Sequence, residues 1–414
     1  MDFLSIVSLK FFLFFLKTRF SFLLAELPHA LLFFSVFIDT NSKISQFLPI
    51  DTPNSSFRRI IGSNLFPPIL ILQFVRNPVT SWWIDEKKAV HDLMVKQGRF
   101  LWYSSKSETE VLIAYGRGKL NNGVDPIFNS TILSKELAVA ILASRVSLFF
   151  DYSIDIAESL INGHMGICFY VSKDRKYLWL CYPSETTLSL AAASILRGGV
   201  FSWGECVQKI QEYTKMGLVE AGYRGELVSK IILSATWDSC QTFETHKSVT
   251  VKDFLTELGG KQLIEALKIN NCEEGEMNRF LKGRLFFTHF TYVAYTVTSE
   301  EELMNFCQKG QAIFCKLRQE AIDLIIPVIL DSDTSVPRFT FIAVQCKNHL
   351  LYDSDGHGSA ESTMTAERAG FKDWKLPYLV LFMSLGAYNY PDETPTIQSL
   401  IIPKRRNLNS KLLI

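Results

Sequence analysis

Apolar residues form two nearly continuous runs near the C-terminus, at 322–328 and 341–347, with a turn-rich segment between them. The pattern predicts two neighbouring buried strands. Each run nevertheless contains polar residues, Asp323 in the first and Gln345 and Lys347 in the second. Because side chains alternate along a strand, Gln345 and Lys347 leave the same face. An unpaired buried charge costs several kcal/mol, so we expect these three groups to face one another or a metal ion.

Helical periodicity dominates the middle of the chain and is interrupted by a few β-like segments. Apolar residues recur with helical spacing at 86–98, 134–150, 184–196, 203–216, 225–239 and 249–269, the last with a break at Gly259-Gly260; Ser299 opens a capped helix at 299–309. Strands are expected at 166–171, 177–182, 285–297 and 377–387. This order predicts an α/β protein in which a mainly helical module with a small hairpin, 81–217, precedes an α/β domain at 218–390.

The two ends of the chain have different patterns. Residues 1–40 are strongly apolar, but charges at Lys10, Lys17 and Glu26 interrupt them. A membrane-spanning helix needs about 20 predominantly apolar residues, so we expect an N-terminal extension first, a membrane-anchoring helix pair second and a signal peptide third. Residues 41–80 are rich in Ser, Asn, Thr and Pro and predict a linker, and residues 391–414 form a C-terminal tail.

Composition narrows the class of protein. The chain has 414 residues, of which 48% are apolar and 21% charged, and this is typical of globular domains. Its net charge of +1 provides no overall attraction to nucleic acid or anionic membrane. The eight cysteines include no CxxC pair, so we interpret them as reduced thiols of an intracellular protein rather than as zinc ligands or disulfides.

Several common catalytic motifs are absent from the sequence. There is no GxxxxGK[ST] loop, and the Gly116-Arg117-Gly118-Lys119 segment lacks the Ser or Thr that would hold magnesium. HExxH and GxSxG are also absent. We therefore expect no nucleotide cofactor.

The remaining candidate constellation is Glu226, Asp323, Gln345 and Lys347. Cleaving a phosphodiester requires an activated water and neutralisation of the charge that develops on the phosphate, and a divalent ion provides both. Mg²⁺ prefers oxygen ligands, so Asp323, the Gln345 amide oxygen and Glu226 could bind it, with the backbone carbonyl of Cys346 beside them. Lys347 would then orient the attacking water or stabilise the transition state.

These residues resemble the PD-(D/E)XK nucleases, and within them the Mrr-like restriction-enzyme branch in which glutamine replaces the first acid of the last motif. The matching pieces are Asp323, the Gln345-Cys346-Lys347 segment, and Glu226 in the preceding helix. The resemblance extends over about 218–390. It implies a restriction-endonuclease-like mixed sheet flanked by helices, Mg²⁺ or Mn²⁺ as cofactor, and DNA as the substrate of an endonuclease.

A looser resemblance involves segments 221–228, 287–290 and 323–328. They are similar to uncharacterised fungal proteins related to the Crinkler-type effectors, which couple an NTPase-like region to such a nuclease domain. This implies a nuclear or cytoplasmic protein, with delivery into a host cell as a further option.

Simpler interpretations stay open for each of these residues. Asp323 could cap a turn, and Gln345 and Lys347 could point to solvent from an edge strand. Glu226 could compensate the helix dipole, and His289 is better explained as a hydrogen-bonded core histidine than as a base. Glutamine at position 345 removes one negative charge from the metal site, so the alternative function is a non-catalytic effector or binding module on the same fold.

Overall fold

The computed structural model describes residues 98–401 except 100, 103–104, 106, 130, 149–153, 172–177, 216–222, 243–245, 269–273, 331–336, 349–363 and 386–399. The expected N-terminal extension, the linker, the helix at 86–98 apart from Gly98, and most of the tail lie outside the described residues. Every described residue belongs to a single unit of the chain, Ser45–Ile414.

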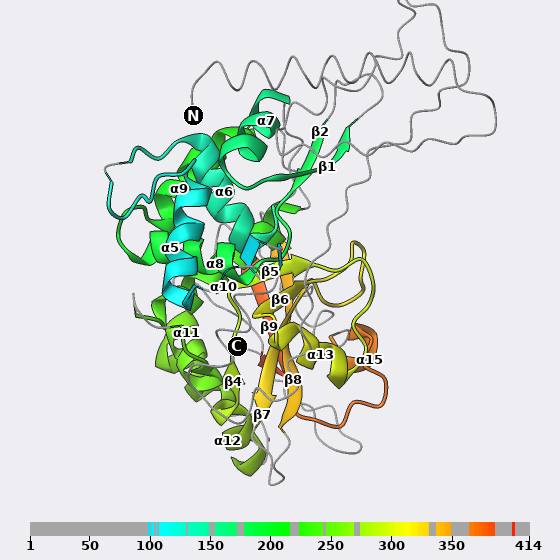
Figure 1. The fold of residues 1–414 in the computed structure, drawn as a ribbon. Helices are drawn as coiled ribbons and strands as arrows, with labels where there is room; N and C mark the ends of the chain where they lie inside the picture. Colours follow the sequence, from blue (N-terminus) through cyan, green and yellow to red (C-terminus); the bar gives the residue numbers. More distant parts are fainter. Residues whose placement is uncertain are drawn as a thin grey trace, which may run out of the picture. The chain divides into compact units, whose positions relative to one another are not determined.

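The first described region is mainly helical and has its own apolar core. Its α6 begins after Ser134, whose side chain accepts a hydrogen bond from the Leu137 N–H at 3.0 Å, as expected for an N-cap. The antiparallel pairing of β1 with β2 confirms the predicted hairpin. The elements of this region (Figure 1) are α5 Thr109–Leu120, α6 Lys135–Val146, α7 Ile154–Gly163, β1 Ile167–Val171, β2 Leu178–Cys181, α8 Thr186–Arg197 and α9 Trp203–Lys215.

The second region is built around a mixed sheet, so the α/β class is confirmed. Within the described residues the sheet has eight strands, in the order β10-β9-β8-β7-β4-β3, with β6 also paired to β7 and β5 paired to β6. β8 runs parallel to β9 and antiparallel to β7. The strands are β3 Val249–Thr250, β4 Arg284–Leu285, β5 His289–Tyr292, β6 Gln311–Phe314, β7 Leu324–Leu330, β8 Arg338–Asn348, β9 Leu379–Leu385 and β10 Leu400–Ile401.

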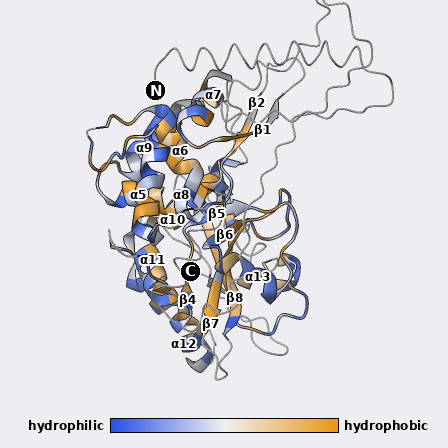
Figure 2. Ribbon diagram, in the orientation of Figure 1, coloured by the Kyte–Doolittle hydropathy of each residue, from blue (hydrophilic) through white to orange (hydrophobic). Residues whose placement is uncertain are grey.

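Helices cover both faces of this sheet because both faces are apolar. Along β7, Leu324, Ile326 and Val328 belong to one core cluster, whereas Ile325 and Ile329 belong to the other. Figure 2 shows β7 as hydrophobic along its length and α13 as largely hydrophilic on its outer side. The helices of this region are α10 Tyr223–Ser239, α11 Val251–Lys268, α12 Glu274–Lys282, α13 Glu300–Cys307 and α15 Ala366–Ala369.

Local signals in the sequence located several of these helices. Ser299 accepts a hydrogen bond from the Glu302 N–H at 3.2 Å and is the N-cap of α13, which confirms the predicted cap. The predicted break in the helix at 249–269 is confirmed at Gly260, where φ is 75° and ψ is −178°.

The single strand expected at 285–297 was wrong. The structure divides it into β4 and β5, because Leu285 pairs antiparallel with Val328 of β7 whereas His289 pairs parallel with Gln311 of β6. Between them the Thr288 N–H donates to the Gly310 carbonyl at 2.7 Å. A change of partner strand cannot be seen in local β propensity, which reports only that a segment suits a pleated, half-buried surface.

In the part of the chain that the structure describes, none of the helices has both the length and the apolar character needed to span a membrane.

Candidate functional site

Asp323 lies immediately before β7 and is held on both sides by neighbouring backbone. Its N–H donates to the Val344 carbonyl at 2.9 Å, and its carbonyl accepts from the Cys315 N–H at 2.9 Å. The carboxylate oxygen Oδ2 accepts a hydrogen bond from the Cys346 N–H at 2.7 Å. This side chain therefore points at the backbone of β8 rather than into solvent.

Gln345 follows the last pair of the β7–β8 ladder, Leu324 with Val344. Its two neighbours in β8, Val344 and Cys346, contact the core on the α10 side, so the side chain of Gln345 leaves the other face of the sheet, the one covered by α13. Among the described residues, the Gln345 oxygen Oε1 is buried and has no hydrogen-bond partner. A buried acceptor of this kind costs about 1–3 kcal/mol unless a donor or a cation reaches it.

Lys347 follows two residues later on the same strand, opposite Ser384 of β9. Strand alternation gives it the same face as Gln345, while its side chain lies outside what the structure describes. β8 is an interior strand, since it pairs with β7 on one side and with β9 on the other. The ladder with β7 ends at Val344, however, so at Gln345 and Lys347 the strand pairs with β9 alone. The buried Oε1 contradicts a solvent-facing Gln345, and the solvent-facing interpretation of Lys347 stays open.

Glu226 lies in the first turn of α10, which packs against β8 on the other face of the sheet. Its oxygen Oε2 is buried without a hydrogen-bond partner among the described residues. Burial raises the pKa of the Cys346 thiol well above its ordinary value, and Asp323 and, more weakly, Glu226 add to that rise. The structure thus brings the Asp323 carboxylate to the backbone of Cys346, whereas Glu226 on α10 lies on the face of the sheet opposite to Gln345.

Within the described ranges, the structure shows no group of three or more His, Cys, Asp and Glu side chains arranged to hold a metal ion. The expected ligand set contains only two acids, and its third side-chain ligand would be the amide oxygen of Gln345. Oxygen donors of this kind suit Mg²⁺ or Mn²⁺ rather than zinc. Among the described residues, the unpartnered oxygen of Gln345 is the feature that fits such an ion, whereas the unpartnered oxygen of Glu226 lies on the other face of the sheet.

Comparison with known proteins identifies a family without assigning a function. The model of a domain of unknown function, DUF8736, matches residues 129–412. The chain belongs to this family. No curated protein and no solved structure matches the chain. The DUF8736 match begins before α6 and continues beyond β10, so it includes helices of the first region together with the whole described sheet.

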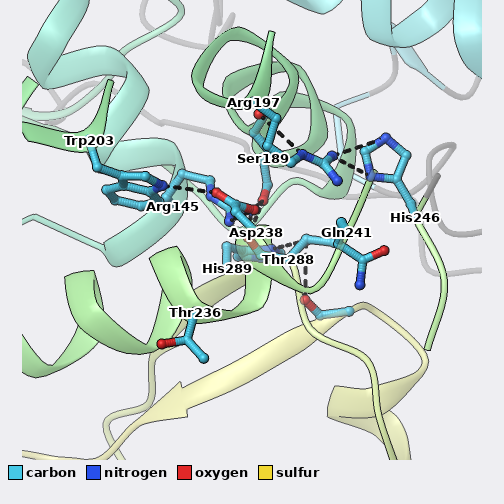
Figure 3. A network of polar contacts seen from close by, with 12 residues as sticks. Arg145, Ser189, Arg197, Trp203, Thr236, Asp238, Gln241, His246, Thr288 and His289 are labelled. Carbon is cyan, nitrogen blue, oxygen red and sulfur yellow. Dashed lines mark hydrogen bonds and ion pairs between the residues drawn. The ribbon is translucent and has the colours of Figure 1, made fainter. Parts of the chain in front are cut away.

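The two parts of the DUF8736 region are joined by a buried polar network that the sequence pattern did not reveal (Figure 3). Arg145 of α6 forms an ion pair with Asp238 of α10 at 2.6 Å, and these side chains are 0% and 5% exposed. Arg145 also donates to the Thr288 carbonyl, and Ser189 of α8 donates to the same carbonyl at 2.7 Å. Trp203 Nε1 donates to the second Asp238 oxygen at 3.1 Å.

His289 belongs to the same junction. It is 2% exposed, and its Nε2 lies 2.5 Å from the Ser184 hydroxyl while its Nδ1 lies 2.8 Å from the Thr288 hydroxyl. Burial, followed by the Arg145 cation, lowers its pKa to about 3. The prediction of a hydrogen-bonded core histidine is confirmed.

Lys230 is the residue near the site that sequence reasoning missed. It lies one turn after Glu226 in α10 and is 0% exposed. Burial lowers its pKa well below the ordinary value, and Glu226 opposes that shift. The available signal was a lysine four residues after a glutamate within an apolar helix, a spacing that places both on one face.

Proposed function

We propose that this protein is a metal-dependent phosphodiesterase of PD-(D/E)XK type that cleaves DNA. The observation that carries the proposal is the hydrogen bond from the Cys346 N–H to the Asp323 carboxylate. It places that acid beside the Gln345-Cys346-Lys347 segment, in which the buried amide oxygen of Gln345 has no partner among the described residues. The mixed sheet with α10 on one face and α13 on the other supports a restriction-endonuclease-like fold.

Asp323, Gln345 and the Cys346 carbonyl would hold the ion. Glu226, the further ligand expected from the sequence, lies on α10 at the face of the sheet opposite to Gln345. A bound Mg²⁺ or Mn²⁺ would supply an activated water and neutralise charge that develops on the phosphate. Asp323 is oriented for this task by the Cys346 N–H. Gln345 contributes an uncharged oxygen, so the site is weaker than one with an acid at that position.

Lys347 would donate to the scissile phosphate or to the attacking water from the position two residues beyond Gln345. With a net charge of +1, binding to DNA would depend on local contacts with phosphates rather than on the overall field. A DNA substrate and reduced thiols agree with a nuclear or cytoplasmic location.

The test is plasmid cleavage by the full chain. Wild-type protein should nick supercoiled plasmid in Mg²⁺ or Mn²⁺, and Asp323→Asn and Lys347→Ala should each reduce the rate by at least about 100-fold. Asp323→Asn keeps an oxygen that can accept from the Cys346 N–H, so the loss would not come from unfolding. Glu300→Gln, which removes a charge from an exposed pair with Arg338, is the matched control and should retain activity.

The outcomes separate the two functions. Intact plasmid after long incubation with Mn²⁺ would refute cleavage. Retention of labelled DNA by that inactive protein, lost on Lys347→Ala, would establish the non-catalytic binding module instead.

A further inference from the structure

The loop between β6 and β7 lies at the edge of the candidate site. It runs from Cys315 to Asp323, and the Cys315 N–H closes it by donating to the Asp323 carbonyl at 2.9 Å. Because β8 runs antiparallel to β7, the 345–347 segment continues past this same end of the sheet. The loop therefore leads directly into Asp323 and lies beside the segment that the Asp323 carboxylate contacts.

A tight turn in this loop has arginine at a position that favours glycine or asparagine. The Gln319 N–H donates to the Lys316 carbonyl at 3.1 Å, so Arg318 is the third residue of a four-residue turn, and its φ is 62°. A turn with a positive φ at this position usually has Gly or Asn there, because other side chains strain the backbone. Ala321, three residues later, also has a positive φ, of 69°.

This strained loop is held in place by its surroundings. The Gln319 side-chain amide donates to the Ala369 carbonyl of α15 at 3.1 Å, and the Ile322 N–H donates to the Glu320 carbonyl at 2.9 Å. A conformation that costs free energy persists only where neighbouring structure fixes it, and such positions are concentrated at binding sites and active sites. Turn chemistry alone would select another residue at position 318.

The side chains of this loop offer positive charge and apolar surface to solvent. Leu317 is 70% exposed, the largest exposed fraction of any large apolar side chain described from Tyr223 onward. Arg318 is exposed and Lys316 is half-buried, and among the described residues neither has an ion-pair partner. These two cations outnumber the single acid of the loop, Glu320.

We propose that the 316–321 loop contacts the DNA substrate, with Lys316 and Arg318 bound to phosphates and Leu317 packed into the minor groove. Cations that neutralise phosphates supply much of the affinity of proteins for DNA, and apolar side chains beside them can insert into the minor groove. This inference rests on the proposed function, since it names the element that would bring a phosphodiester to Asp323.

The test is binding of a fluorescein-labelled duplex of about 20 base pairs to the full chain in EDTA, where neither metal binding nor cleavage contributes. Arg318→Asn should weaken binding about tenfold at about 0.1 M KCl, and it should reduce the slope of log affinity against log salt by about 0.9, the contribution of one phosphate contact. Leu317→Ala should weaken binding without changing that slope, because it removes no charge.

Two matched controls remove similar groups elsewhere. Lys261→Gln removes an exposed cation from α11, and Ile132→Ala shortens a side chain that is 90% exposed. Both variants should bind the duplex as wild type does. Arg318→Asn should unfold at the same urea concentration as wild type or at a higher one, because asparagine adopts a positive φ more readily than arginine. Its weaker binding would therefore not come from loss of folding.

The outcomes separate this inference from the proposed function. Arg318→Asn that binds as tightly as wild type, with an unchanged slope, would overturn the inference and leave cleavage untouched. Equal losses in the two controls would also overturn it. Weaker binding by Arg318→Asn, together with plasmid that stays intact in Mn²⁺, would support the inference while refuting cleavage. Wild-type protein that binds no duplex would overturn both.

Discussion

His289 shows how one buried side chain couples the fold to pH. Its two ring nitrogens face hydroxyl groups of Ser184 and Thr288, and no carboxylate among the described residues bonds to it. A protonated imidazole would be desolvated next to Arg145, so the folded chain keeps this histidine neutral and its pKa falls from 6.5 to about 3.

The first residue-scale prediction follows from this shift. Between about pH 6.5 and 3, the unfolded chain binds a proton at position 289 and the folded chain does not, so stability falls as pH falls. The slope from this residue is up to about 1.4 kcal/mol per pH unit. Urea unfolding at a series of pH values should show a shallower dependence for His289→Gln than for wild type.

Ser184→Ala is the control for that experiment. It removes a hydrogen-bond partner but keeps the buried histidine, so it should lower stability at every pH without removing the slope. Equal slopes for wild type and His289→Gln would contradict the assignment.

At the scale of elements, α11 contains a break that depends on a single residue. Gly260 has a φ of 75° and a ψ of −178°, a conformation that is essentially confined to glycine. A Cβ placed there would meet no heavy atom within 4 Å. The requirement for glycine is therefore conformational and not a matter of space. Gly259, the preceding residue, does not have a positive φ.

These two neighbouring glycines give a matched pair of substitutions. Gly260→Ala should destabilise the protein by about 1–3 kcal/mol through backbone strain. Gly259→Ala should be neutral or stabilising by up to about 1 kcal/mol, because alanine favours the helix and reduces the freedom of the unfolded chain. Urea unfolding would measure both, and effects of the same sign would contradict the described break.

At the scale of the whole molecule, the helical region and the sheet share buried polar contacts. The Arg145–Asp238 pair joins α6 to α10, and removing one partner of a buried pair costs about 3–5 kcal/mol. Thr186 of α8 adds a further link, donating to the Lys309 carbonyl at 2.8 Å. Separating the regions would leave several of these groups without partners.

We therefore expect a fragment of residues 218–414 to lack cooperative folding. It loses α6 with Arg145, the ion-pair partner of Asp238, and it loses Ser184, whose hydroxyl contacts Nε2 of His289. Near-UV circular dichroism and thermal melts should show a cooperative transition for a longer fragment, 98–414, and none for 218–414. A native-like spectrum of the shorter fragment would show that the sheet folds independently.

The sequence located most elements because their signals are local. Ser299 caps the start of α13 and Gly260 breaks α11, both at the positions predicted from residue type. The two apolar runs form β7 and β8. The polar residues within those runs predicted a site, which stays a prediction, and the structure places the Asp323 carboxylate on the Cys346 N–H.

Only the tertiary structure decided which groups meet across long separations in the chain. Three features depend on packing between distant segments. They are the hydrogen bond of the buried Lys230 to the Ser147 carbonyl, the ion pair of Arg145 with Asp238, and the position of β8 between β7 and β9. Periodicity reports which face of an element is apolar. It does not report which element will cover that face, because the choice depends on the free energy of the whole assembled core.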